Sequence, residues 1–536
     1  MATITIDDIE YTVAEGRNLI DAVAELGIDI PHFCYHPGLP ADGNCRMCLT
    51  EMEIRPGQFG MVTSCTMRIK DGMNFRFNSP ATLDNRKGIM EFLLINHPLD
   101  CSWCDQAGEC SLQDNSFDHG RSKSRFIETK RVPPQKELGP HIQLFTTRCI
   151  LCQRCTRFCD EITGTSELGI IEMGARSEIA VFDGQPLNNK MSANVADICP
   201  VGALVTKDFL YKPRIWHYKK INSVCPGCAT GCNTTHEVMH QKIYRTKPRH
   251  NEEVNSYWMC DEGRFSYHDW QDLDRLKSPM KRENGVLVAT TWPDAIQLAV
   301  DGLSGLLDDG GNSSVGVVGS AMMTNEENYL LKQLAELALK TSAIGLYRKP
   351  EGEEWTAKGG FRIEPDKTPN LRGASDILGT SDMQGILDGI NSGDIKGLYM
   401  LGGHMNLALS ESEKSTLSKL DLLVVQDVCD SDLVTLAHIA LPGAIPFEKD
   451  GTTTNIQGRV QRLNQVAPPP GAARLDGDIL QYIGQKFNTV LGPKTPAEIM
   501  GDISEKVDDY KGLNYSMIGE SGALASGVNP LEEAGG

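Results

Sequence analysis

The sequence predicts a chain of several domains, α+β in its first half and α/β in its second half. Three observations predict this. The chain has 536 residues, a length typical of three or four domains. All but one of its 17 cysteines lie in residues 1–260. From about residue 271, patterns of buried strands alternate with patterns of helices, which is typical of a mainly parallel sheet.

Composition excludes several classes of function. The net charge of −19 and the absence of a long basic run argue against a nucleic-acid partner. No apolar run reaches the length of a bilayer span, and the first residues do not have the pattern of a secretory signal. We therefore expect a cytoplasmic protein without direct membrane insertion. Disulfides are rare in the cytoplasm, so many cysteines indicate metal or redox chemistry.

The first predicted domain spans residues 1–80. Residues 3–13 read as a hairpin around an Asp-Asp turn, and a helix follows that Asn18 can cap and Gly27 ends. A cysteine-containing loop comes next. Hairpin, helix and cysteine loop is the order of a β-grasp, plant-type ferredoxin.

The cysteines of this domain are spaced C-x10-C-x2-C-x16-C, at Cys34, Cys45, Cys48 and Cys65. Four thiolates can hold a [2Fe–2S] cluster, because soft sulfur donors suit iron–sulfur chemistry. A zinc site is the alternative, but it normally pairs two C-x2-C knuckles and only one is present.

The second segment, residues 81–120, contains a predicted helix over residues 82–96 that leads into "HPLDCSWCDQAGEC". Its three cysteines, Cys101, Cys104 and Cys110, lack a fourth. His97 precedes them closely and is the predicted fourth ligand of a [4Fe–4S] cluster, with a distant cysteine as the alternative. Imidazole in place of thiolate removes negative charge and should raise the reduction potential.

The third segment, residues 121–218, contains "RCILCQRCTRFCD", the run of one half of a two-cluster bacterial ferredoxin. The matching run should end in Cys-Pro, which Cys199-Pro200 supplies. The three preceding ligand positions hold Asn189, Ser192 and Val195. One [4Fe–4S] cluster therefore remains, with the ligands Cys149, Cys152, Cys155 and Cys199. Cys159 is then the orphaned ligand of a lost cluster, and we expect it to be a buried small hydrophobe.

A fourth set lies in residues 219–270, spaced C-x2-C-x3-C-x27-C, at Cys225, Cys228, Cys232 and Cys260. This triplet spacing favours a third [4Fe–4S] cluster over zinc. Gly263 allows a tight turn beneath the last ligand.

Residues 271–490 read as the α/β domain, and residues 491–536 as a mobile tail. We expect Cys429, the one cysteine of this half, to be structural. The sequence shows neither a G-x-G-x-x-G fingerprint after a strand nor a Walker A loop. No catalytic residue is expected on this chain, so the electron donor and acceptor sites should lie on other chains.

With these motifs identified, the chain resembles the large iron–sulfur subunits of bacterial NADH:quinone oxidoreductase, respiratory complex I. The resemblance rests on "IPHFCYHPGLPADGNCRMCL", "HPLDCSWCDQAGEC", "RCILCQRCTRFC" with "DICPVGAL", and "CPGCATGC" with "WMCDEGRF", in the order of that family. It implies an electron-transfer subunit of a proton-translocating enzyme, peripheral on the cytoplasmic face of the inner membrane.

The resemblance also implies roles and partners. The [2Fe–2S] site would receive electrons from an NADH- and FMN-binding subunit. The Cys149 set would pass them to the His97 set, which would feed a two-[4Fe–4S] ferredoxin-like subunit. Other peripheral-arm subunits would complete the assembly, and the Cys225 set would lie off the main path.

The second half, in "EKDGTTTNIQGRVQRLNQ", resembles a degenerate molybdopterin-oxidoreductase α/β domain. In formate-oxidising relatives a lysine lies two residues after the last cluster ligand, where this chain has Glu262. The chain also ends without their C-terminal barrel. No molybdopterin is therefore expected. The competing interpretations are a relay subunit of an NAD-linked formate dehydrogenase or hydrogenase, and an interaction scaffold with structural clusters.

Overall fold

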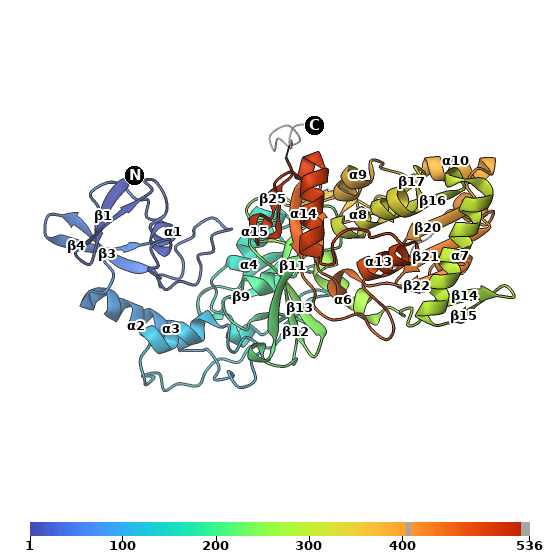
Figure 1. The fold of residues 1–536 in the computed structure, drawn as a ribbon. Coiled ribbons are helices and arrows are strands. Elements are labelled where there is room, and N and C mark those ends of the chain that lie inside the picture. Colours follow the sequence, from blue (N-terminus) through green and yellow to red (C-terminus); the bar gives the residue numbers. More distant parts are fainter. Residues whose placement is uncertain (404–408, 527–536) are drawn as a thin grey trace. The chain divides into compact units, whose positions relative to one another are not determined.

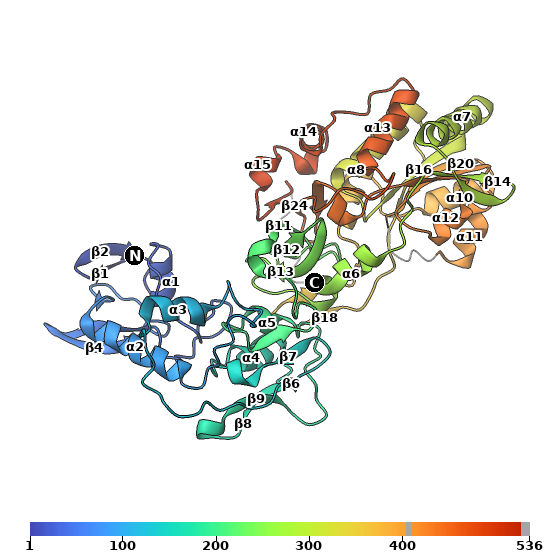
Figure 2. The same ribbon diagram turned by 90° about the horizontal axis from the view of Figure 1, so that it is seen from below.

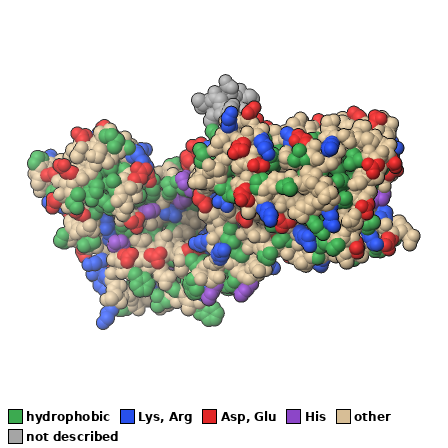
Figure 3. Space-filling model, in the orientation of Figure 1, with side chains coloured by type: hydrophobic (Ala, Val, Ile, Leu, Met, Phe, Trp, Pro, Cys, Tyr) green, Lys and Arg blue, Asp and Glu red, His purple; other side chains and the backbone are tan. Residues whose placement is uncertain are grey.

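A computed structural model describes residues 1–403 and 409–526 (Figure 1). The chain divides into two compact units, which are described separately. Unit 1 comprises Met1–Tyr218 and Ala357–Phe361, and unit 2 comprises Lys219–Thr356 and Arg362–Gly536. On the face drawn in Figure 3, acidic and basic side chains are interspersed over both units.

Unit 1 begins with a five-stranded sheet in the order β2-β1-β5-β3-β4. Its strands are β1 (Ala2–Ile6), β2 (Ile9–Val13), β3 (Leu49–Arg55), β4 (Gln58–Thr63) and β5 (Asn74–Arg76). Asp7 and Asp8 form the predicted hairpin turn with φ of 48° and 66°, as a two-residue turn of this kind requires. The short helix α1 (Leu19–Ala24) packs Leu19 and Val23 into the core of this sheet. The predicted β-grasp order of elements is confirmed.

Two helices follow the sheet. Helix α2 (Pro80–Leu94) begins where the Ser79 side chain accepts a hydrogen bond from the Thr82 N–H, and it ends three residues before His97. Helix α3 (Ser111–His119) begins directly after Cys110 and packs against α2. The residues between these helices form a loop that contains the other cysteines of the second set.

The rest of unit 1 has little regular structure, and its loops carry the third cysteine set. A small sheet has the order β10-β7-β6, and β8 pairs with β9. These strands are β6 (Lys136–Glu137), β7 (Ile142–Leu144), β8 (Leu168–Ile171), β9 (Glu178–Val181) and β10 (Leu204–Thr206). Helix α4 (Arg154–Arg157) continues into a π-helical turn, Phe158–Thr163, and helix α5 (Asn194–Asp197) precedes Cys199.

Unit 2 begins with an antiparallel sheet of β11 (Lys219–Val224), β12 (Asn233–Met239) and β13 (Lys242–Pro248). Helix α6 (Asp261–Asp272) packs on β13. The fourth cysteine set lies on the loops of this small module, at the end of β11, before β12 and at the start of α6.

The larger part of unit 2 is a seven-stranded sheet in the order β15-β14-β22-β21-β20-β16-β17. The strands from β22 to β17 pair in parallel, whereas β14 and β15 are antiparallel at one edge. The strands are β14 (Met280–Glu283), β15 (Val286–Ala289), β16 (Val315–Ser320), β17 (Ile344–Tyr347), β20 (Gly397–Leu401), β21 (Leu422–Asp427) and β22 (Ile439–Pro442). The expected mainly parallel sheet is confirmed.

Helices cover both faces of this sheet (Figure 2). On one face lie α7 (Trp292–Gly310), α8 (Asn325–Gln333) and α13 (Asp476–Lys486). On the other lie α10 (Gln384–Ser392), α11 (Glu411–Leu417) and α12 (Asp432–Leu436). Alternate residues of β16 serve the two cores, because successive side chains of a strand point to opposite faces: Val317 belongs to the first and Val318 to the second. Helix α9 (Leu371–Leu378) and the strands β18 (Trp355–Thr356), β19 (Arg362–Ile363), β23 (Gly451–Thr454) and β24 (Arg459–Leu463) complete the domain.

The prediction that residues 491–536 form a mobile tail is wrong for most of its length. Helix α14 (Pro496–Lys506) packs on α8 and buries Ile499, Met500 and Ile503. Helix α15 (Tyr515–Ile518) and strand β25 (Ala523–Leu524) follow, and β25 pairs with β24. The apolar residues of α14 share one helix face, so their burial outweighs the weak periodicity of the stretch as a whole. The last ten positions of the predicted tail lie outside the described residues.

Candidate iron–sulfur centres

The first cysteine set lies together in the ferredoxin-like domain of unit 1. Cys34, Cys48 and Cys65 are buried and Cys45 is partly buried. The Cys48 and Cys65 Sγ atoms are 3.5 Å apart. The backbone N–H groups of Phe33 and Cys34 both donate to Cys45 Sγ at 3.4 Å, and such donors favour the thiolate form that metal binding needs.

These thiols share protons. Hydrogen bonds from Cys45 and then Cys65 lower the pKa of Cys34 to about 2. The same hydrogen bonds raise the pKa values of Cys45 and Cys65. A bound cation would replace the shared protons, because thiols bind metals as thiolates. The four sulfur donors and the short contacts among them therefore fit a [2Fe–2S] cluster.

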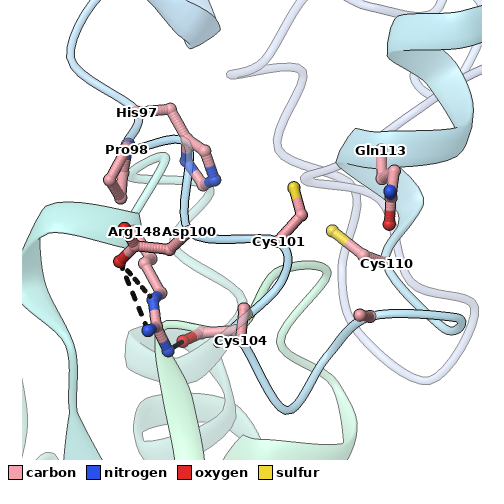
Figure 4. Close-up of a pocket in the computed structure, with 10 residues that line it drawn as sticks. His97, Pro98, Asp100, Cys101, Cys104, Cys110, Gln113 and Arg148 are labelled. Atoms are coloured by element: carbon pink, nitrogen blue, oxygen red, sulfur yellow. Dashed lines mark hydrogen bonds and ion pairs between the residues drawn. The ribbon is translucent and has the colours of Figure 1, made fainter.

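The four predicted ligands of the second set line one cavity with about 300 Å³ of empty space, part of it open to solvent. His97 reaches it from the end of α2, and Cys101, Cys104 and Cys110 reach it from the loop before α3 (Figure 4). Arg148 forms another part of the lining and pairs with Asp100 at 3.3 Å.

The chemistry of this cavity fits a metal cluster. His97 Nδ1 is buried without a hydrogen-bond partner. Burial, followed by the charges of Lys130 and Arg148, lowers the pKa of His97 to about 4, so its imidazole is neutral near pH 7. A neutral imidazole nitrogen without a partner is a free metal ligand. Burial also raises the pKa of Cys110 to about 11, so its thiolate form requires a nearby cation.

Two residues outside the cysteine motifs shape this site, and the sequence did not reveal them. Lys130 Nζ donates to the carbonyl oxygens of Leu94, Ile95 and His97 at 2.8, 3.0 and 2.8 Å, so it caps the end of α2 and holds the backbone of His97. A Cβ at Gly202 would lie 2.2 Å from Cys104 Sγ, which leaves room only for glycine. Both contacts join positions far apart in the sequence, and no local signal marks them.

The third set also surrounds a single cavity, with about 340 Å³ of empty space. Its lining includes all four predicted ligands: Cys149, Cys152, Cys155 and Cys199. Burial raises the pKa values of Cys149 and Cys152 to about 12. Three buried cysteines and the partly buried Cys149 around one cavity fit a [4Fe–4S] cluster, whose irons would stabilise the thiolates.

Cys159 is not among the lining residues of that cavity and is fully buried in the π-helical turn. Burial, followed by the Glu167 charge, raises its pKa to about 12. Of the positions where a second cluster would need ligands, Asn189 instead donates to Glu167, with Nδ2 2.6 Å from Oε2. Ser192 and Val195 are fully buried. Asn189 is thus held by a hydrogen bond, and Ser192 and Val195 are packed in the interior, at the three positions where a second cluster would need ligands.

In the fourth set, Cys225, Cys228, Cys232 and Cys260 are all buried in unit 2. A Cβ at Gly263 would lie 2.7 Å from Cys225 Sγ and 3.4 Å from Cys260 Sγ, so both sulfurs converge beside this glycine. The Gly263 N–H donates to Cys260 Sγ at 3.3 Å at the start of α6. Burial raises the pKa of Cys260 to about 12, so its thiolate form also requires a nearby cation. The set fits a [4Fe–4S] cluster.

Glu262 does not stand as a lone negative charge beside this set. Lys367 Nζ lies 3.1 Å from Glu262 Oε2, and the Lys367 side chain is largely buried. Lys367, from another segment of the chain, therefore offsets the charge of Glu262. This pairing weakens the sequence argument that Glu262 would repel an anionic cofactor.

The stretch from Glu448 to Gln465, which carries the resemblance to molybdopterin oxidoreductases, contributes buried ion pairs to the α/β domain. Glu448 pairs with Arg275 at 2.7 Å. Lys449 Nζ lies 2.9 Å from Glu327 and 2.8 Å from Asp476, and all three side chains are buried. Such charges are tolerated in a core because each has a partner. Cys429 is buried in a separate hydrophobic cluster, as expected for a structural residue.

Residues 1–403 and 409–526 contain neither a membrane-spanning helix nor a compact site for a single metal ion. Within these ranges, no helix is long and apolar enough to cross a bilayer. No three His, Cys, Asp or Glu side chains there lie close enough together to hold a single metal ion. The fit of the four sets therefore rests on their cavities, sulfur contacts and buried thiols.

Family models match five successive stretches of the chain. They are the 2Fe-2S iron-sulfur cluster binding domain (1–80), the NADH-ubiquinone oxidoreductase-G iron-sulfur binding region (86–125), the NADH-quinone oxidoreductase subunit 3 ferredoxin-like domain (139–205), the molybdopterin oxidoreductase Fe4S4 domain (218–270) and molybdopterin oxidoreductase (275–362 and 370–486). These matches confirm the predicted fold class: a [2Fe–2S] ferredoxin domain, [4Fe–4S] domains and a molybdopterin-oxidoreductase-like domain.

Individual curated proteins match more than half of the chain. The G subunit of NADH-quinone oxidoreductase from Rickettsia felis is 40% identical over 336 residues, covering 63% of this chain and 49% of the relative. The NADH-ubiquinone oxidoreductase 75 kDa subunit of Reclinomonas americana is 40% identical over 334 residues, covering 62% and 47%. The chain thus spans about half the length of these curated relatives.

Among solved structures, an NAD+-reducing [NiFe]-hydrogenase chain is 28% identical with a TM-score of 0.36, covering 40% of this chain and 91% of that one. At this TM-score the similarity between the two folds is weak. The sequence relatives and the matched iron–sulfur domains, by contrast, agree with one another. By these matches, the iron–sulfur domains of the chain are similar to those of NADH-quinone oxidoreductase G subunits.

Proposed function

We propose that this chain is the electron-relay subunit of an NADH:quinone oxidoreductase, respiratory complex I. The observation that carries the proposal is that two cavities of unit 1, each lined by one predicted ligand set, share a wall. Iron–sulfur clusters, when bound, accept and release single electrons. The sixteen ligands predicted from the sequence would hold one [2Fe–2S] and three [4Fe–4S] clusters in the domains bounded as above.

The shared wall consists of two short segments whose successive residues face different cavities. Arg148 lines the His97 cavity, whereas its neighbour Cys149 lines the other. In the same way, Gly202 lines the first cavity, and Val201 and Ala203 line the second. Electron tunnelling weakens steeply with distance, so cavities that are lined by adjacent residues of the same two segments support transfer between the two sites.

The protein supplies the surroundings of each site. Burial of the Cys149 set excludes water and keeps the thiols protonated until a metal binds. His97 supplies a neutral ligand, which makes its site less negative than a site with four thiolates. The His97 site therefore carries one negative charge fewer than the Cys149 site. Its reduction potential should be higher, so electrons should prefer it.

The proposed partners are those that the resemblance to complex I subunits implies. An NADH- and FMN-binding subunit would donate to the ferredoxin domain, and a two-[4Fe–4S] ferredoxin-like subunit would accept from the His97 segment. Other peripheral-arm subunits would hold the assembly on the cytoplasmic face of the inner membrane. The α/β domain would serve without a molybdopterin.

The test compares two serine variants of the chain in membranes that contain the complex. Cys152→Ser removes a ligand of the third set and should abolish NADH-dependent quinone reduction together with one [4Fe–4S] EPR signal. Reduction of a soluble dye at the flavin subunit should persist. Cys429→Ser, a buried cysteine outside the four sets, is the matched control and should retain both activities.

Quinone reduction that survives Cys152→Ser at the wild-type rate would contradict the proposal. Membranes that reduce NAD+ with formate or hydrogen, and lose this activity in Cys152→Ser, would instead favour a formate dehydrogenase or hydrogenase relay.

A further inference from the structure

Two arginines between the cysteines of the third set reach into the ferredoxin domain of the same unit. They are Arg154 and Arg157, at the two ends of α4, and Cys155 lies between them. Arg157 donates to the carbonyl oxygens of Cys34 and Pro40. These carbonyls belong to the loop that carries the first [2Fe–2S] ligand, so α4 is joined directly to that loop.

Arg154 connects the two ligand sets through their nearest neighbours. One of its terminal nitrogens donates to the carbonyl oxygen of Ile198 at 3.1 Å, and Ile198 precedes Cys199. The other donates to the carbonyl oxygen of Tyr35, which follows Cys34. The guanidinium of Arg154 therefore links Tyr35, next to Cys34 of the first set, with Ile198, next to Cys199 of the third set.

Further observations mark this junction as a built contact. Arg154 lines the cavity of the third set. The Nε atoms of Arg154 and Arg157 are buried without hydrogen-bond partners, so each still has a donor available at this junction. Asn44 adds a third link, because its Nδ2 donates to the carbonyl oxygen of Leu151 at 2.9 Å.

We propose that Arg154 and Arg157 are positioning residues, an arginine clasp that fixes the Cys34 loop against the Cys149 site and so sets the rate of transfer between them. This rests on the proposed function. In that transfer one electron leaves the reduced [2Fe–2S] site and enters the oxidised [4Fe–4S] site, without bond or proton changes. The planar fork of arginine suits this role, since it can hold two carbonyl oxygens at once.

The test uses the full cluster-loaded chain and a graded set of variants. Arg154→Gln and Arg157→Gln remove the clasp, and Arg154→Lys keeps the charge but cannot hold both carbonyl oxygens in the same fork. Arg55→Gln, an exposed arginine at the end of β3, is the charge-matched control. Iron content and EPR spectra first establish which variants retain both clusters.

The first readout is amide hydrogen exchange at residues 34–44. It should become about tenfold faster in Arg154→Gln and Arg157→Gln, because charged hydrogen bonds are lost, with Arg154→Lys between these and the wild type. The second readout is freeze-quench EPR after partial reduction with dithionite. Transfer from the [2Fe–2S] to the [4Fe–4S] signal should slow at least tenfold in the glutamine variants.

Exchange and transfer rates in both glutamine variants equal to those of Arg55→Gln would overturn the clasp. If Arg154→Gln loses a cluster, Arg157→Gln and Arg154→Lys decide the matter alone. A wild-type chain whose [2Fe–2S] site never passes its electron on would count against the proposed function. The exchange response to Arg154 and Arg157 would still show whether the clasp exists.

Discussion

At the scale of single residues, His97 differs from the cysteines of its set in charge and in how it is held. Its imidazole is neutral because burial and two nearby cations lower its pKa to about 4. The sequence indicated it as a ligand through its position before an incomplete cysteine trio. The support from Lys130 and the space left by Gly202 could not be predicted, because both depend on contacts between distant segments.

Replacing His97 by cysteine tests its role. His97→Cys should retain the cluster but lower its potential by roughly 100 mV or more, because a thiolate adds negative charge. Potentiometric EPR measures the change, and His250→Cys, at a half-exposed histidine of unit 2, is the control. An unchanged potential with unchanged iron content would mean that another residue is the fourth ligand.

Cys159 is predicted to be the orphaned ligand of a lost second cluster. The prediction that it is a buried small residue agrees with its complete burial. Cys159→Ser should therefore leave the iron content unchanged, whereas Cys155→Ser should remove about four iron atoms. Colorimetric iron analysis of the two variants distinguishes them, and a loss of iron in Cys159→Ser would show that it is a ligand.

At the scale of secondary-structure elements, the sequence predicted best where local chemistry decides. The Asp-Asp hairpin, the helix before His97 and the buried strands of the α/β sheet all carry clear local patterns, and the structure contains each of them. Helix α14 was missed, although Thr495 forms a capping box with Glu498 and Pro496 occupies its first turn. The weak periodicity of the surrounding stretch obscured these signals.

The C-terminal end of helix α2 is capped by Lys130, a residue outside the helix. Lys130→Met should remove three hydrogen bonds to carbonyl oxygens at the end of α2 and loosen His97. We expect amide exchange at residues 94–97 to become about tenfold faster and the EPR signal of the His97 cluster to weaken. Lys123→Met, an exposed lysine of the same segment, is the control. Equal behaviour of the two variants would show that α2 needs no such cap.

At the scale of the whole molecule, the chain combines cysteine-rich modules with an α/β domain whose hydrophobic cores are accompanied by buried ion pairs. The division between them was predicted from the cysteine distribution and from the alternation of strand and helix patterns after about residue 271. The buried charges of the core, such as Lys449 with Glu327 and Asp476, could not be predicted, because burying a charge is tolerated only where a partner from another element meets it.

The stability of unit 2 should depend on pH through His236. This side chain is buried, bonds Thr246 at 3.0 Å, and has its pKa lowered to about 4 by burial. The unfolded chain binds the proton from about pH 6.5 downward and the folded chain only near pH 4, so stability falls as pH drops through this window.

Over that window the free energy of unfolding should fall by up to about 1.4 kcal/mol per pH unit. Urea unfolding of the wild type and of His236→Gln at pH 7.5 and 5.5 measures it as a difference between the two proteins. A difference that does not change with pH would mean that His236 is not kept neutral by the fold.

The central claim, a relay of one [2Fe–2S] and three [4Fe–4S] clusters without a pterin cofactor, is tested most directly by metal analysis. The chain is purified without oxygen, and its iron, molybdenum and tungsten are measured per chain. The account predicts about 14 iron atoms and neither of the other metals. About four more iron atoms would mean that the second ferredoxin cluster survives at Cys159. Stoichiometric molybdenum or tungsten would contradict the account and make the α/β domain an active site.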